Sequence, residues 1–196
     1  SRFAPGPTDV DLGQGSKFAI FLPQPLVDLR RSHLFFEAFA RVAAERPDVH
    51  LSWIAHPRTA ARNQEMRELL ETAGVAAQTT MLTPIPPPDM VGYYRAADAV
   101  ADWFNADLPA VSQTALEAMA CGRPVIMSLP TDSENYLNSS GALPGNNVGL
   151  IESSLRRLVD APQLRVQSGS TGREWVREYH DMPKVGRQLV AIYQSL

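Results

Sequence analysis

Residues 93–127 predict a helix, a buried strand, a polar loop, a second helix and a second buried strand in unbroken succession. The first strand spans residues 99–104, and the loop at 105–111 leads to Ser112, a residue type that favours the N-cap of a helix. In an open parallel sheet, ligands bind beyond the carboxyl ends of the strands, where helix N-termini present unpaired N–H groups and partial positive charge. The segment therefore predicts a nucleotide-binding half-unit, with the start of its second helix facing an anion site.

The chain before this segment alternates between apolar runs and helical patterns. The predicted strands are residues 17–22, 49–55 and 75–82, and the predicted helices are residues 32–46, 60–73 and 89–97. Strands that alternate with helices imply right-handed crossovers and a parallel sheet that is covered on both faces. We therefore predict the α/β class, with a doubly wound Rossmann-like parallel sheet, helices on both faces and extra C-terminal helices.

The two ends of the chain have different patterns. Residues 1–16 are rich in Gly, Pro and Asp without any period, which predicts an interdomain linker, and one domain would then span residues 17–196. Towards the C-terminus, a short helix is expected at residues 133–137 and a short strand near 148–151. Three further helices are expected at residues 153–160, 162–179 and 182–196. Their apolar residues at helical spacing are expected to pack on the sheet: Trp175, Val176 and Tyr179, then Val185, Leu189, Ile192 and Tyr193.

Composition argues against several function classes. The net charge of −3 is small and the Lys and Arg residues are scattered, so nucleic acid is not expected as a partner. No apolar run approaches the roughly 20 residues that span a bilayer, so no membrane span is expected in this chain. The single cysteine, Cys121, excludes an internal disulfide, predicts a buried thiol and is consistent with a cytoplasmic location. The four histidines lack metal-ligand spacing, and we expect neither a metal nor another cofactor.

Two stretches carry a resemblance to a known family. Residues 94–98 spell YRAAD and residues 116–125 spell LEAMACGRPV, which resemble the C-terminal domain of family four (group 1) glycosyltransferases. Shorter similar stretches are RFAP at residues 2–5, FEAFA at 36–40 and DAP at 160–162. Enzymes of this family have two Rossmann-like domains in the GT-B arrangement, the first binding mainly the acceptor and the second mainly the nucleotide sugar. The resemblance implies the second, donor-binding domain, whose partner is an N-terminal acceptor-binding domain of the same parent chain, absent here.

The resemblance assigns a ribose contact to Glu117, because the family's glutamate at this position holds the ribose hydroxyls of the nucleotide sugar. A carboxylate, which only accepts hydrogen bonds, suits that role. The alternative is a glutamate stabilised by the helix dipole alone. The family's second carboxylate stands eight residues earlier, where this sequence has Pro109. Asp107 is the nearby candidate for a catalytic carboxylate, although a shift of two residues moves the group by several ångströms, and the catalytic residue is otherwise unknown.

The family's phosphate clamp is an arginine followed about five residues later by a lysine. The alignment puts Pro25 at the arginine and Arg30 at the lysine, with Arg31 adjacent. Either arginine can bind phosphate oxygens bidentately, and the alternative is a pair of solvated arginines at a helix start. Residues at the second helix start offer backbone N–H groups to the same phosphates: Ser112, Gln113 and Thr114. Ser112 would also serve as a cap without any ligand.

Two further positions have a functional and a structural interpretation. The proline-rich loop at residues 83–88 corresponds to the family's nucleobase site, for which the candidates are Leu82, Thr83 and Pro84. The same loop also suits a rigid turn before a helix. Asp102 ends the predicted strand facing the crevice, or only accepts backbone hydrogen bonds.

The resemblance implies the donor-binding half of a retaining glycosyltransferase, of hexosyltransferase type, that transfers a sugar from a nucleotide diphosphate sugar to an acceptor in carbohydrate biosynthesis. The nucleotide sugar is a substrate rather than a cofactor, and the isolated domain is expected to be inactive because the acceptor site is missing. An alternative from another class is a non-catalytic glycosyltransferase-like scaffold or sugar-nucleotide-binding domain, which Pro25 and Pro109 favour. A sugar-nucleotide epimerase and a flavodoxin-type binding protein are further alternatives.

Overall fold

The computed structural model describes residues 2–132 and 134–194. The strands are β1 (Phe18–Leu22), β2 (Val49–Ile54), β3 (Thr79–Leu82), β4 (Ala99–Ala101), β5 (Val125–Met127) and β6 (Leu143–Pro144). They form a sheet in the order β3-β2-β1-β4-β5-β6, in which every neighbouring pair is parallel. The chain order reverses between β1 and β4, which creates the switch point where ligands bind in open α/β sheets. The predicted doubly wound α/β class is confirmed.

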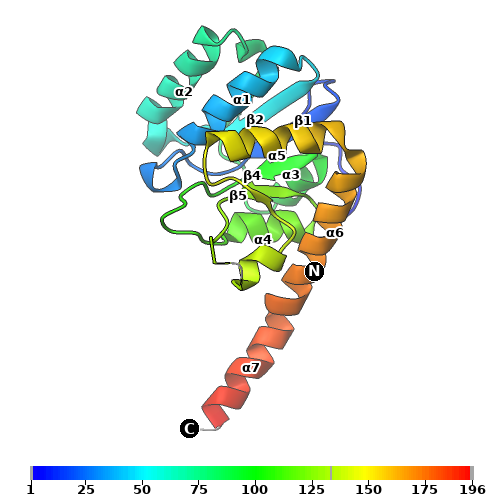
Figure 1. Cartoon of the computed structure of the whole chain (residues 1–196). Coiled ribbons are helices and arrows are strands. Elements are labelled where there is room, and N and C mark those ends of the chain that lie inside the picture. The colour runs from blue at the N-terminus through cyan, green and yellow to red at the C-terminus, as the bar shows by residue number, and fades with distance from the viewer. Residues whose placement is uncertain (1, 133, 195–196) are drawn as a thin grey trace.

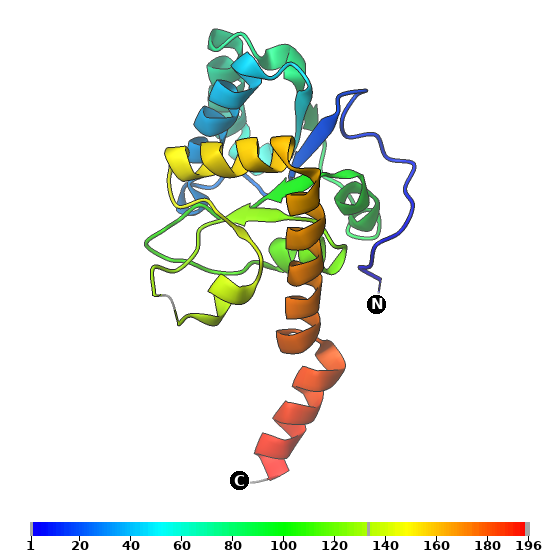
Figure 2. The same cartoon turned by 45° about the vertical axis from the view of Figure 1, so that its right-hand side comes forward.

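Helices cover both faces of this sheet (Figures 1 and 2). The α-helices are α1 (His33–Glu45), α2 (Ala60–Thr72), α3 (Met90–Ala96), α4 (Gln113–Ala120), α5 (Val148–Asp160), α6 (Pro162–Tyr179) and α7 (Met182–Gln194). Short 3-10 turns are η1 (Asp28–Arg30), η2 (Pro57–Thr59), η3 (Ala76–Gln78) and η4 (Tyr136–Ser139). Helices α1, α2 and α5 lie on one face and α3 and α4 on the other, while α6 packs against both α4 and α5.

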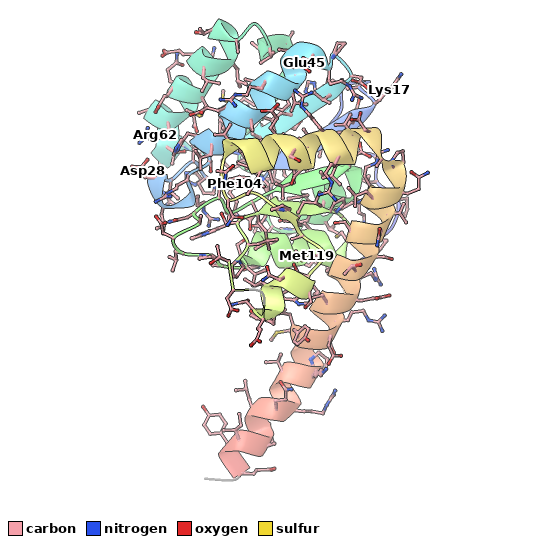
Figure 3. All side chains as sticks on the ribbon, viewed as in Figure 1. Lys17, Asp28, Glu45, Arg62, Phe104 and Met119 are labelled. Atoms are coloured by element: carbon pink, nitrogen blue, oxygen red, sulfur yellow. The ribbon has the colours of Figure 1, made fainter. Side chains whose placement is uncertain are left out.

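The alternation of side chains along the strands builds two hydrophobic cores. Ile20 of β1 belongs to the core under α1 and α5, and its neighbour Phe21 belongs to the core under α3 and α4. Phe104 and Met119, both labelled in Figure 3, are members of the first and the second core respectively. Because every residue of β1 is buried, the strand is fixed from both faces and its carboxyl end is a rigid support.

A close approach of backbones fixes α4 against α6. Gly122, with a φ of 74°, lies just beyond the end of α4, and Gly169 of α6 packs against it. A Cβ on Gly169 would overlap the carbonyl oxygen of Gly122 and lie 2.8 Å from its carbonyl carbon, so only glycine allows this packing. The helix whose N-terminus faces the switch point is therefore held firmly at its other end.

Three predicted strands differ from the observed elements. The strand expected at residues 99–104 is shorter, since β4 ends at Ala101. The strand expected at residues 75–82 is shorter, because a 3-10 turn, η3, precedes β3. The strand expected near residues 148–151 is wrong, since these residues form the first turn of α5. Asn147 caps that helix through its Oδ1, which accepts a bond from the Leu150 N–H at 2.9 Å. In place of the short helix expected at 133–137, the structure has η4, and Ser133 lies outside the described residues.

Helix α7 does not pack on the sheet, so that expectation is wrong. It continues beyond the body of the fold after α6 (Figures 1 and 2), and Leu189, Ile192 and Tyr193 are exposed. Trp175 of α6 is buried in the core under α3 and α4, which includes strand residues, and it stacks on Tyr136 of η4 with ring centroids 5.4 Å apart. The helical period predicts correctly that these faces are apolar, but it does not determine what lies against them.

The N-terminal segment lies along α3. Arg95 Nε donates to the carbonyl oxygen of Ala4 at 2.9 Å, and Thr8 Oγ1 donates to that of Gly92 at 3.0 Å. The division into a linker at residues 1–16 and a domain at 17–196 stays a prediction. Cys121 is buried as expected, and burial raises the pKa of its thiol to about 11. Within the described part of the chain, no helix has both the length and the apolar character needed to cross a bilayer.

Candidate functional site

The start of α4 lies just beyond the carboxyl end of β4, and Ser112 caps it as predicted. Its Oγ accepts a hydrogen bond from the Ala115 N–H at 3.2 Å. The same hydroxyl donates to Oδ2 of Asp102 at 2.6 Å. Ser112 therefore fixes the helix N-terminus, whose backbone N–H groups suit an anion, and joins it to the end of the neighbouring strand.

Asp102 is the buried charge of this site. Its side chain is fully buried, and Oδ1 lies 3.7 Å from Nη1 of Arg30. Burial raises the pKa of the Asp102 carboxyl, while the hydrogen bond from Ser112 and the charge of Arg30 act in the opposite direction. A carboxylate beside the N-terminus of α4 is also stabilised by the helix dipole.

Arg30 is held by contacts with Phe104, Trp103 and Asp102. Its carbonyl oxygen accepts a bond from the Phe104 N–H at 3.0 Å, and its guanidinium lies over the Trp103 ring, 5.0 Å from the centroid. Burial lowers the pKa of Arg30, although the charge of Asp102 raises it. Nη1 of Arg30 and Oδ1 of Asp102 are buried atoms without a hydrogen-bond partner among the described residues. The arginine thus brings positive charge to the start of α4 with hydrogen-bonding capacity left unused.

Arg31 points to a different partner. It adopts a left-handed conformation with a φ of 52°, and its guanidinium forms an ion pair with Asp107. The Asp107 N–H also donates to Oδ1 of Asn105 at 3.1 Å. The structure therefore brings the candidate catalytic carboxylate to one candidate phosphate ligand, in an exposed pair separate from Arg30 and Asp102.

Gln24 is a member of the site that the sequence reasoning missed. It is buried, and its Nε2 donates to Ser112 Oγ at 3.3 Å and also to Thr114 Oγ1. These bonds tie the loop after β1 to the first turn of α4. The available signal was a polar residue two positions after a buried strand, between Pro23 and Pro25.

Glu117 lies one turn further along α4, where both of its carboxylate oxygens accept hydrogen bonds. The hydroxyl of Tyr94 donates to Oε2 at 2.9 Å. Gln113 Nε2 donates to Oε1 at 2.8 Å. Gln113 is exposed, whereas Tyr94 is fully buried. Tyr94 was also missed as a site residue, although it begins the YRAAD stretch that carries the resemblance.

The candidate nucleobase loop lies at the edge of the sheet. Leu82 ends β3, accepts a bond from the Ala55 N–H at 2.9 Å and packs against the core under α3 and α4. Thr83 and Pro84 are exposed. The structure thus connects Arg30, Ser112 and Thr114 through Asp102 and Gln24. Leu82–Pro84 lie at the end of the edge strand β3, two strands away from β1.

The arrangement combines three chemical capacities. An arginine and a helix N-terminus favour an anion such as a phosphate, and a carboxylate one turn away accepts bonds from hydroxyl groups. Among the described residues, no group of three or more His, Cys, Asp or Glu side chains is placed to hold a metal ion.

Comparison with protein families gives a match over most of the chain. Residues 26–159 match the model of the family described as "Glycosyl transferases group 1". Among curated proteins, a D-inositol 3-phosphate glycosyltransferase of Arthrobacter sp. is 29% identical over 115 residues, covering 56% of this chain and 26% of the relative. One of Pseudarthrobacter chlorophenolicus is 30% identical over 149 residues, covering 72% and 34%. The chain thus spans only about a quarter to a third of the length of these relatives.

Solved structures share the fold at low sequence identity. The C-terminal domain of the group 1 glycosyl transferase LpcC from Francisella tularensis superposes with a TM-score of 0.74 at 20% identity, covering 92% of this chain and 96% of that one. Anabaena Alr3699/HepE, solved in complex with UDP, gives a TM-score of 0.79 at 16% identity, covering 94% of this chain and 50% of that one.

Proposed function

This chain belongs to the group 1 family of glycosyl transferases, and we propose that it is the donor-binding half of a retaining enzyme that transfers a sugar from a nucleotide diphosphate sugar. An N-terminal domain of the parent protein supplies the acceptor site, so the chain by itself does not transfer sugar efficiently. We also propose a cytoplasmic location, where nucleotide sugars would be available and the lone thiol of Cys121 stays reduced.

In this proposal the diphosphate binds at the start of α4. The leaving nucleoside diphosphate gains negative charge during transfer, and fixed positive groups around it lower the barrier. Arg30 supplies a guanidinium, and the first N–H groups of α4, at Gln113 and Thr114, supply backbone donors. The Glu117 carboxylate accepts hydrogen bonds from the ribose hydroxyls, and Leu82–Pro84 contact the base.

The observation that carries the proposal is the continuous network at the start of α4. Arg30 faces Asp102 at 3.7 Å, Asp102 accepts from Ser112 at 2.6 Å, and Ser112 caps the helix that carries Glu117. The network thereby ties the Arg30 guanidinium of η1 to the start of α4, and the Glu117 carboxylate follows about one helical turn further along that helix.

Calorimetric titration with UDP, GDP and ADP tests this function. UDP is the first probe because the structurally similar HepE is solved with UDP. We expect one of the three to bind with a dissociation constant below about 1 mM, and Glu117→Gln to weaken that binding about tenfold or more, since a hydrogen bond to a charged group is lost.

The matched control is Glu174→Gln, which changes an exposed glutamate on α6. It should leave the affinity unchanged. If none of the three diphosphates binds, or if Glu117→Gln and Glu174→Gln behave alike, the proposed donor site is wrong.

A non-catalytic sugar-nucleotide-binding domain is the second candidate, and a specific observation favours it. Pro109 occupies the position of the family's second carboxylate, and the neighbouring Asp107 is engaged in an exposed ion pair with Arg31. The two candidates differ in turnover by the full-length parent protein. Donor hydrolysis or transfer that is lost in the Glu117→Ala parent would eliminate the non-catalytic alternative.

A further inference from the structure

Tyr94 donates a hydrogen bond to Glu117, the candidate ribose contact. Its hydroxyl lies 2.9 Å from Oε2 of Glu117 and, being fully buried, cannot exchange this partner for bulk water. Burial and the charge of Glu117 both raise the pKa of the Tyr94 hydroxyl. Tyr94 therefore keeps its proton at neutral pH, and in this pair it acts as the hydrogen-bond donor.

The ring of Tyr94 is fixed by its neighbours. It meets Phe21 of β1 edge-on, with centroids 5.9 Å apart and an interplanar angle of 64°. It also meets Phe3 edge-on at 6.1 Å and 66°. Because α3 and β1 hold this ring in place, the hydroxyl defines one position in space for the Glu117 oxygen that accepts from it.

The hydrogen bonds leave room for a ligand on the same carboxylate. Each carboxylate oxygen has about two acceptor sites. Tyr94 occupies one site on Oε2 and Gln113 occupies one on Oε1. A vicinal diol such as a ribose needs one further site on each oxygen, with the carboxylate plane held in one orientation.

We propose that Tyr94 is a positioning residue that orients the Glu117 carboxylate for the two ribose hydroxyls, and so sets the preference for ribonucleotides. This inference rests on the proposed donor site. Tyr94 touches no ligand itself and acts through Glu117. Gln113 contributes less to this orientation, because its side chain is exposed and its bond competes with water.

A purely structural tyrosine would also be buried and hydrogen-bonded, so stability alone does not test the proposal. The distinguishing quantity is the ratio of the affinities for UDP and 2′-deoxy-UDP, measured by calorimetry on this chain. A general loosening of the fold weakens both ligands alike, whereas a misoriented Glu117 weakens UDP more than 2′-deoxy-UDP, because UDP has two hydroxyl contacts to lose and the deoxynucleotide only one.

The variant is Tyr94→Phe, and the matched control is Tyr93→Phe. Tyr93 belongs to the same helix and also packs on Phe21, with ring centroids 5.8 Å apart, but no hydrogen bond joins its hydroxyl to Glu117. We expect Tyr94→Phe to reduce the preference for UDP by about threefold to tenfold, the range of one typical hydrogen bond, while Tyr93→Phe leaves it unchanged. A preference that is unchanged in Tyr94→Phe would overturn the inference.

Glu117→Gln separates this inference from the proposed function. If Glu117→Gln reduces the preference and Tyr94→Phe does not, the ribose contact stands and only the positioning role fails. If neither change matters, or if neither nucleotide binds, the donor site itself is wrong and the positioning role falls with it.

Replacement of Tyr94 by 4-aminophenylalanine tests whether a loss of preference in Tyr94→Phe comes from the missing hydrogen bond or from altered folding. The amino group keeps a donor at the ring position of the hydroxyl, so the ribonucleotide preference should return to about the value of the unmodified chain. A preference that stays low in this variant, despite normal thermal unfolding, contradicts the proposal.

Discussion

At the scale of single residues, Asp102 shows how a buried charge is accommodated. A buried carboxylate costs free energy unless hydrogen bonds and opposite charge surround it. Ser112 donates to one of its oxygens, and Arg30 lies 3.7 Å from the other. Burial nevertheless outweighs both partners, because the pKa of Asp102 is raised in the folded chain.

The raised pKa predicts a pH-dependent stability. Between the unfolded value of about 3.8 and the raised folded value, the folded chain holds the Asp102 proton while the unfolded chain has lost it. This contribution to stability is therefore present below the unfolded pKa and is lost as pH rises through the folded pKa. Asparagine does not titrate, so the stability of the unmodified chain relative to Asp102→Asn should fall as pH rises from about 4. Urea unfolding of both proteins across this range measures the difference.

Asp48→Asn is a control with the opposite sign. The hydrogen bond from Arg46 lowers the pKa of Asp48, so its contribution to stability is present above the unfolded pKa and is lost as pH falls. The advantage of the unmodified chain over Asp48→Asn should accordingly increase with pH, below about pH 4. If both variants show the same slope, burial does not raise the pKa of Asp102 in the folded chain.

At the scale of elements, helix starts organise both the site and the last third of the fold. Helix α4 begins after Ser112 and α5 begins after Asn147, and in each case the side-chain oxygen accepts from a backbone N–H three residues later. Ser112 is further bound by Asp102 and Gln24, whereas Asn147 acts as a cap alone among the contacts described. Substitutions of Asn147 therefore measure how much a helix cap alone contributes to the free energy of unfolding.

Replacing Asn147 by Ala should lower the free energy of unfolding by about 1 kcal/mol, because the Leu150 N–H loses its acceptor. Asn147→Asp keeps an acceptor at the same place and should cost only a few tenths of a kcal/mol or nothing. Urea unfolding followed by circular dichroism gives both values, and hydrogen exchange at the Leu150 amide locates the effect. Equal stability of the two variants, with unchanged exchange at Leu150, would mean that α5 does not begin at Asn147.

Elements whose signals lie close together in the sequence are predicted correctly, and those that depend on distant residues are not. The helix around Glu117 has a cap, an apolar face and a terminal glycine within ten residues, and it was placed correctly. The run at 148–151 is short and apolar, which suits a strand and a helix equally, and only the Asn147 cap and the buried Ile151 and Leu155 identify α5. Within the site, Gln24 and Tyr94 were missed because their partners are about 90 and 23 residues away in sequence.

At the scale of the whole molecule, α7 stands apart from the rest. The body of the fold buries α1 to α6 against the sheet or against each other, whereas α7 extends away from it (Figures 1 and 2). Among the described residues of α7 none is buried, and the apolar side chains of Leu189, Val190 and Tyr193 are exposed. The apolar burial that stabilises the fold therefore lies in the body formed by the sheet and α1 to α6, and not in α7.

This arrangement predicts unequal costs for the same substitution in two helices. Leu158 of α5 is fully buried, so Leu158→Ala should lower the free energy of unfolding by about 2–5 kcal/mol through lost burial and the cavity left behind. Leu189 of α7 is 51% exposed, so Leu189→Ala should change it by less than about 0.5 kcal/mol. Urea unfolding of the two variants, with equal m-values as the check on a two-state transition, measures both costs. A cost for Leu189→Ala that approaches that of Leu158→Ala would show that α7 folds back onto the body in solution, covering the apolar face that the sequence pattern predicted to be packed.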